Sequence, residues 1–149
     1  MELRVSASVM PAPTANSADL SVSCRLSHRP EAEISIVKSI HLRTSLKDYT
    51  LSLSANASMH GTPIMTPLWF HFPHDPELQE REVVDSFMFG PKYLAAPVLE
   101  LGARNRTVYL PRSEGGWAHY YSQAHYAGGE NVTVEAPYDE LPLFVRQAW

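Results

Sequence analysis

Apolar residues recur at helical spacing in the segment that begins near Ala32. A single stripe comprises residues separated by four, three, four and four positions: Leu42, Leu46, Tyr49, Leu53 and Ala57. His60 and Gly61 indicate the end of this helix, because glycine readily takes the left-handed conformation past a helix and Pro63 cannot continue the hydrogen-bond ladder. The pattern predicts one long α-helix over residues 31–61.

After residue 85 the pattern changes to short runs of aromatic and β-branched residues separated by turn residues. Gly115-Gly116 and Gly128-Gly129 supply positions where a positive φ costs little. Strands are expected around residues 86–89, 93–99, 107–110, 118–122, 131–135 and 143–146. The predicted fold is therefore mainly β: an antiparallel β-sandwich over residues 62–149, preceded by the long helix.

The remaining segments carry weaker patterns. Residues 1–30 are rich in Ser, Ala and Pro without a sustained period, which predicts a poorly ordered leader, flexible or foreign to the fold. Within it, the alternation of 20–26 favours a strand only if another strand offers an edge. The run IMTPLWFHFP (64–73) predicts an extended entry into the sandwich, followed by an acidic connection over 74–82.

Composition narrows the class of partner. The chain has 149 residues, 44% of them hydrophobic, and a formal charge of −4 without a Lys/Arg cluster, which argues against nucleic acid and anionic membranes as partners. A lone cysteine, Cys24, excludes an internal disulfide and a multi-cysteine zinc site. No apolar run is long enough for a signal peptide or a membrane span. Sequons at Asn56, Asn105 and Asn131 are potential glycosylation acceptors.

Several specific motifs occur in one order along the chain. They are LRTSLKDYTLSLSANASMHGTPIMTPLWFHFPHD (42–75), DSFMFGPKYLAAPVL (85–99), YLP, GGW, YAGG and the PLFVR that ends at Arg146. Together they resemble the C-terminal part of the catalytic chain in glycoside hydrolase family 31, the α-glucosidase and α-xylosidase family. The resemblance implies hydrolysis of O-glycosyl bonds in carbohydrate metabolism, and it identifies the helix as the last helix of a (β/α)₈ barrel whose strands are missing here.

The same resemblance makes residues 62–149 the proximal sandwich domain after the barrel, with further family strands expected beyond Trp149. One sheet edge should then lack a partner. The chain departs from the family pattern at Thr66, where many members carry an arginine. It also departs at Gln147, where glycine usually follows the arginine.

The family's retaining mechanism uses two aspartates on loops of the barrel, roughly 5 Å apart. Neither those segments nor the tryptophan-aspartate-methionine-asparagine motif occurs here, so we predict no catalytic residue, no cofactor and no metal ligand in this chain. Alternative acid pairs, Asp75 with Asp85 and Asp139 with Glu140, lie in connections where acids commonly face water or cap turns. A structural role is favoured for each of them.

Histidines and aromatic residues are the other candidates. His71, His74 and Asp75 have the residue types of metal ligands, but in an extended segment their side chains should diverge. His119 and His125 flank a turn without an oriented serine, cysteine or aspartate, so solvated histidines are expected there. A sugar-stacking platform would use Trp117, Tyr120, Tyr121 and Tyr126.

Strand alternation argues against such a platform, because it separates the aromatics onto two faces. Tyr120 shares a side with Ala118 and Ser122, opposite Trp117 and Tyr121, so packing in the core is favoured. Two functional hypotheses follow. One is a part of a family 31 glycosidase that is inactive by itself. The alternative is a noncatalytic module that binds an α-linked glycan through its aromatics, or that docks on a barrel domain or a second copy through its helix stripe and open sheet edge.

Overall fold

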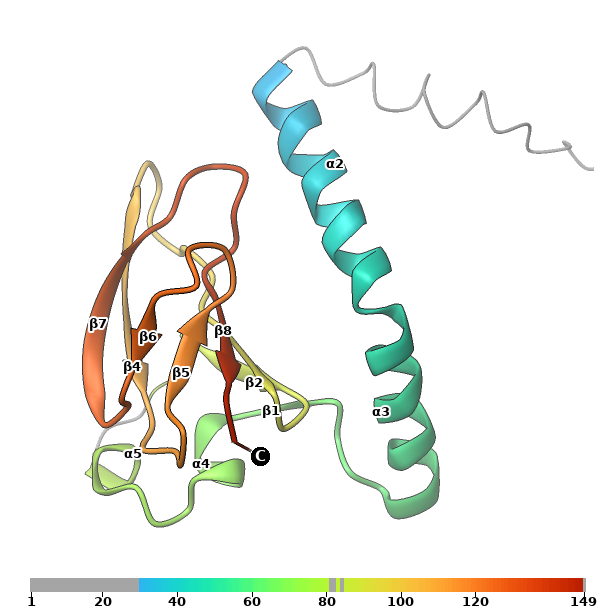
Figure 1. Ribbon diagram of the computed structural model, residues 1–149, viewed down its shortest axis with the longest axis vertical. Helices are drawn as coiled ribbons and strands as arrows, with labels where there is room; N and C mark the ends of the chain where they lie inside the picture. The colour runs from blue at the N-terminus through green and yellow to red at the C-terminus, as the bar shows by residue number, and fades with distance from the viewer. Residues whose placement is uncertain (1–29, 81–82, 84, 149) are drawn as a thin grey trace, which may run out of the picture.

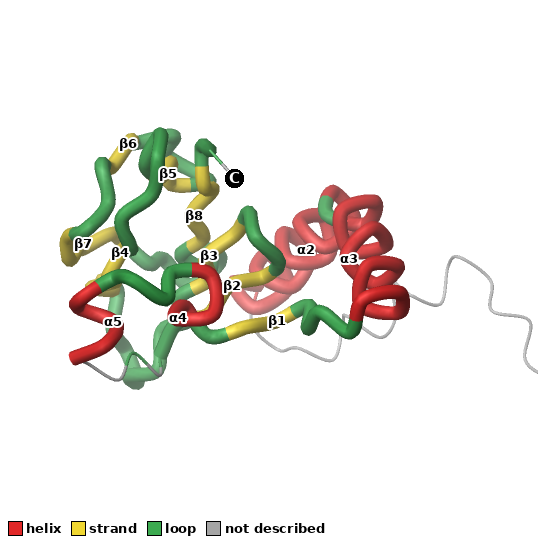
Figure 2. Tube along the Cα trace, turned by 90° about the horizontal axis from the view of Figure 1, so that it is seen from below, coloured by secondary structure: helices red, strands yellow, loops and turns green. Residues whose placement is uncertain are grey.

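The computed structural model describes residues 30–80, 83 and 85–148. The predicted leader, the strand-like piece 20–26 and Cys24 lie outside the described residues. Figure 1 shows helices α2 (Pro30–Ser45) and α3 (Lys47–His60) as a rod beside a β-sandwich, and Figure 2 shows the same separation from below. The predicted class, a mainly β sandwich preceded by helix, is confirmed.

The helical region differs from the single helix that the sequence predicts. It is interrupted at Leu46, whose φ of −90° and ψ of 5° are not helical. Backbone hydrogen bonds still cross the interruption, from Leu46 N to Leu42 O at 3.1 Å and from Thr50 N to Leu46 O at 2.8 Å, so the two helices follow one another closely. The predicted end is confirmed: Gly61 has φ 70° and donates its N–H to Ala57 O.

The strands form two antiparallel sheets in the described part of the chain. The six-stranded sheet has the order β1-β2-β3-β8-β5-β6, and the two-stranded sheet pairs β4 with β7. Their bounds are β1 Met65–Thr66, β2 Phe87–Phe89, β3 Tyr93–Ala95, β4 Asn105–Leu110, β5 Trp117–His119, β6 His125–Tyr126, β7 Glu130–Glu135 and β8 Leu143–Arg146. Six of these match the predicted strands; β1 and β6, two residues each, do not appear in the sequence pattern.

The core lies between the two sheets. Buried side chains from both meet in one cluster, which includes Leu94, Leu110, Trp117, Val132 and Phe144. Along β7, buried Val132 and Val134 alternate with exposed neighbours, as the period of two requires. The sandwich is therefore held together by one shared apolar interior.

The extended entry predicted for 64–73 is wrong beyond Pro67. Residues Leu68–His71 form a short helix, α4, and Pro76–Glu80 form a second, α5. A helical turn places Leu68 and Phe72, four positions apart, on one side, where both are buried in the core. Burial of these two side chains explains why the segment is helical despite its apolar, proline-bounded sequence.

A second apolar cluster joins the helices to the six-stranded sheet. Leu42, Leu46 and Tyr49 pack against Tyr93 and Leu143, so the predicted stripe covers the sandwich rather than barrel strands. The Tyr49 hydroxyl donates to Phe89 O at 3.1 Å and accepts from Lys92 N at 3.3 Å. Helices and sandwich thus form one packed unit. Among the described residues, no helix has the length and hydropathy needed to span a membrane.

Candidate functional site

Asp75 is buried and bound to three donors. Its carboxylate accepts hydrogen bonds from the Tyr109 hydroxyl at 2.7 Å, from Arg112 N at 3.0 Å and from Glu77 N at 3.1 Å. Burial, and then the bond to Asp75, raise the pKa of the Tyr109 hydroxyl far above its usual value. The side chain fixes the start of α5 against β4. Asp75-Pro76-Glu77 is an N-terminal capping signal that could have predicted α5 from the sequence.

The other three acids also contact basic groups. Asp85 pairs with Arg106, whose guanidinium lies 2.5 Å from the carboxylate and also donates to Asp85 O. Lys38 of α2 donates to Asp139, and its ammonium lies 3.6 Å from Glu140. The bond to Lys38 lowers the pKa of Asp139. These acids join separate elements of the fold, and Asp75 and Asp85 have different partners.

The histidines are placed differently from the sequence expectation. His71 lies on α4, where burial lowers its pKa, and His74 is exposed in the following turn. The described residues contain no group of three or more His, Cys, Asp or Glu side chains gathered as metal ligands. The argument against a metal site rested on an extended segment at 71–75 in which the side chains diverge; His71 instead ends the helix α4.

His119 was expected to be solvated and without an oriented partner; the structure contradicts both points. It is only 7% exposed, and its ring packs on Phe144 with centroids 5.3 Å apart. Its Nδ1 lies 2.8 Å from the Ser122 hydroxyl and accepts the Ser122 backbone N–H at 3.3 Å. The turn thereby brings His119 and Ser122, three positions apart, into hydrogen-bond contact, which strand alternation alone does not predict. His125 is exposed.

The aromatic candidates divide between the two sides of the six-stranded sheet. Trp117 is fully buried in the core, where its indole N–H donates to Pro111 O at 2.8 Å. Tyr126 packs on Phe144 on the same side. Tyr120 instead belongs to the cluster that faces the helices, and its ring meets that of Tyr121 at 5.1 Å. The core role expected for Trp117 is confirmed.

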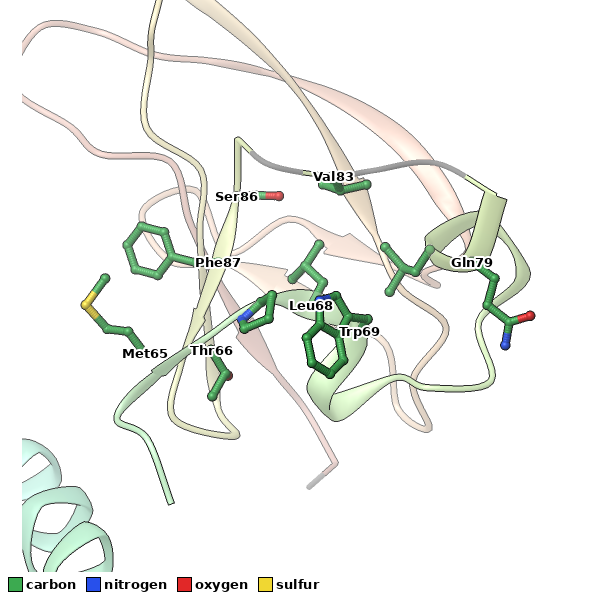
Figure 3. A pocket seen from close by; sticks show the side chains of 10 residues that line it. Met65, Thr66, Leu68, Trp69, Gln79, Val83, Ser86 and Phe87 are labelled. Atoms are coloured by element: carbon green, nitrogen blue, oxygen red, sulfur yellow. The ribbon is translucent and has the colours of Figure 1, made fainter. Parts of the chain in front are cut away.

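A hollow of about 620 Å³ lies where β1 and α4 meet the start of β2 (Figure 3). Its surface is largely apolar and includes Trp69, which is 60% exposed, and Phe87. Thr66 also lines it. The hydroxyls of Thr66 and Ser86 are buried, and neither has a hydrogen-bond partner within the described residues. The hollow offers apolar contact surface rather than charged groups for chemistry.

Comparison with known proteins gives a consistent family. Residues 61–148 match the model of the glycosyl hydrolase family 31 C-terminal domain. A sulfoquinovosidase of Agrobacterium fabrum is 39% identical over 102 residues, covering 68% of this chain and 15% of the relative. A probable glucan 1,3-alpha-glucosidase of rice is 38% identical over 109 residues, covering 73% of this chain and 12% of the relative. The chain thus spans less than a fifth of the length of either relative.

Solved structures agree with the sequence matches. An alpha-xylosidase of family 31 from Xanthomonas citri superposes with a TM-score of 0.74 at 33% identity, covering 80% of this chain and 13% of that one. A xylosidase from Aspergillus niger superposes with a TM-score of 0.76 at 29% identity, covering 82% and 18% respectively. The sandwich fold and the relatives found by sequence lead to the same conclusion: this chain belongs to glycosyl hydrolase family 31 and contains the family's C-terminal domain.

Proposed function

We propose that this chain is a noncatalytic part of a family 31 α-glycosidase and does not hydrolyse glycosides by itself. The observation that carries the proposal is the position of the family match, which falls on the C-terminal domain, in a sequence without the tryptophan-aspartate-methionine-asparagine motif. The role of the sandwich would be to hold the helix pair α2 and α3 through Leu42, Leu46 and Tyr49. The whole enzyme would act on an α-glucoside or α-xyloside.

The chemistry of retaining hydrolysis supports this assignment. It needs two carboxylates roughly 5 Å apart, one to attack the sugar and one to donate and accept the proton. Here Asp75 is bound to three donors, while Asp85 and Asp139 contact basic side chains. Bound in this way, these described acids supply no free, oriented pair for the barrier reduction of about 8 kcal/mol that a modest enzyme supplies.

The test is hydrolysis of p-nitrophenyl α-D-glucopyranoside and α-D-xylopyranoside by the purified chain. We expect nitrophenol release at the rate of a mock purification from the same host. Asp85→Asn and Glu140→Gln serve as matched variants, because each retains the shape of the side chain and removes its charge. Release by the unmodified chain that either variant abolishes would overturn the proposal.

A second candidate function, an interaction module, is favoured by the far side of the helices. Val37, Ile40 and Leu51 lie roughly opposite the stripe that covers the sandwich and are 40%, 52% and 58% exposed. An apolar helix face of this kind is typical of a docking surface. The occupant proposed for it is a barrel domain on another polypeptide.

Copurification with the separately expressed barrel region of a family 31 relative tests this second function. The double variant Ile40→Glu, Leu51→Glu should lose the partner, while Ser52→Glu on the flank of α3 should retain it. A chain that stays alone and monomeric beside the barrel region would reject the docking role, and a homodimer would assign the face to a second copy instead.

A further inference from the structure

Two neighbouring hollows share one boundary at the end of the sandwich nearest α2. The first, about 490 Å³, lies between α2 and the turn after β5, and it is lined in part by His41, Ser45 and Tyr120. The second, about 470 Å³, lies toward β6 and β7, and its lining includes His119 and Glu135. Tyr121 and Glu140 line both hollows, so the two are adjacent. We call them together the tyrosine groove.

Aromatic rings in the groove are fixed by packing. Tyr120 and Tyr121 meet edge to face at 5.1 Å, and Tyr121 meets the ring of His119 at 5.9 Å, also edge to face. His119 in turn packs on the core residue Phe144. Half-buried rings held in this way offer preformed apolar faces at little further entropic cost. The C–H faces of sugar rings are suited to such surfaces.

A buried histidine forms part of the groove wall. His119 is more than nine-tenths buried, lines the groove, and has an Nε2 without a hydrogen-bond partner in the described part of the chain. Its Nδ1 accepts the backbone N–H of Ser122, so in the neutral ring Nε2 carries the proton. Because Nε2 itself has almost no accessible surface, the imidazole ring forms part of the groove wall rather than a contact for a ligand hydroxyl.

The charges of the groove select against anions. Glu135 and Glu140 line it, and the ammonium of Lys38 is already shared between Asp139 and Glu140. A sulfonated, phosphorylated or uronic acid ligand would meet the carboxylate of Glu135, while the Lys38 ammonium is already bound by Asp139 and Glu140. Aromatic faces, hydroxyls and local negative charge together fit a neutral polyhydroxylated molecule. The two adjacent hollows offer room for more than one sugar ring.

We propose that the tyrosine groove binds a neutral oligosaccharide of at least two sugar units, with its rings packed on Tyr120 and Tyr121. The site is assembled by tertiary structure, since its lining comes from α2, from the turn after β5 and from the loop between β7 and β8 (Figure 1). It extends the proposed function from a support role to ligand binding. Binding and hydrolysis are measured separately, so either proposal can fail without the other.

The test is an NMR titration of the ¹⁵N-labelled chain with maltotetraose, with trigalacturonate as an anionic probe of related size. We expect maltotetraose to shift the amide resonances of 119–122 and of Glu140, and trigalacturonate to leave them in place. Tyr121→Ala should weaken maltotetraose binding about tenfold or more, equivalent to about 1.4 kcal/mol. Tyr138→Ala, which removes a 67% exposed tyrosine outside the groove, should retain it.

Folding of Tyr121→Ala is checked by its urea midpoint, and Tyr121→Phe, which retains the ring, should bind like the unmodified chain. No shifted resonance at the solubility limit of maltotetraose would overturn the proposal. The same conclusion would follow from equal binding of trigalacturonate, or from a folded Tyr121→Ala variant with unchanged affinity.

Discussion

Replacement of Asp75 by alanine should destabilise this fold more than removal of any exposed acid. The carboxylate is 6% exposed and accepts hydrogen bonds from one side-chain hydroxyl and two backbone N–H groups. These bonds tie the connection between α4 and α5 to β4 and to the residue that follows Pro111. Alanine removes all three acceptor contacts at once and leaves the donors without a partner.

The size of the effect follows from where each donor lies. The Tyr109 hydroxyl is buried and cannot readily regain a partner from water, so its bond to the carboxylate should contribute about 2 kcal/mol. The N–H groups of Arg112 and Glu77 are only partly buried, and each should cost about 0.5–1 kcal/mol once water replaces the carboxylate. The total is about 3–4 kcal/mol, a large share of the 5–15 kcal/mol typical of a domain.

Urea unfolding at 25 °C, followed by far-ultraviolet circular dichroism and by tryptophan fluorescence, measures the loss. Tyr109→Phe alone should cost about 1–2 kcal/mol, because Asp75 retains two donors. In the double variant the two losses should not add, and the difference should give a coupling energy of about 1–2 kcal/mol. Glu100→Ala, an exposed acid in the loop before β4, should stay within about 0.5 kcal/mol of the unmodified chain.

A loss below about 1 kcal/mol for Asp75→Ala, or additive losses for Asp75→Ala and Tyr109→Phe, would refute this account. Either result would mean that the buried hydroxyl does not depend on the carboxylate for its partner.

Three further predictions concern pH and turn geometry. Burial lowers the pKa of His119, so its contribution to the free energy of unfolding should be fully present above about pH 6.5 and decrease as the pH falls below that value. The decrease in urea midpoint at low pH should be smaller in His119→Gln and unchanged in His125→Gln. The raised pKa of Tyr109 means that stability should fall as pH rises above about 10, and Tyr109→Phe should reduce that loss in thermal melts. Gly116→Ala should lower the melting temperature more than Gly102→Ala, since both have positive φ but only at Gly116 would a Cβ overlap a β6 carbonyl oxygen.

The sequence by itself determined the strands that carry the core and the end of the helix. Alternation along β7 and the paired glycines before β5 and β7 follow from local geometry. Successive side chains in a strand point to opposite faces, and glycine tolerates tight positive-φ turns without strain. The same local rule places Gly61 after α3. The ordered motifs also led to the family, which needed no knowledge of contacts.

Tertiary structure decided the features that depend on residues far apart in the chain. The segment around Leu68 and Phe72 is helical because the core takes both side chains on one side, a choice that an apolar run cannot reveal. Asp75 binds Tyr109, which lies 34 positions away, and Tyr121 lines one hollow together with α2 only because the helix packs on the sandwich. Long-range packing determines which polar side chains are buried and which groups they contact. The local sequence pattern therefore does not predict these contacts.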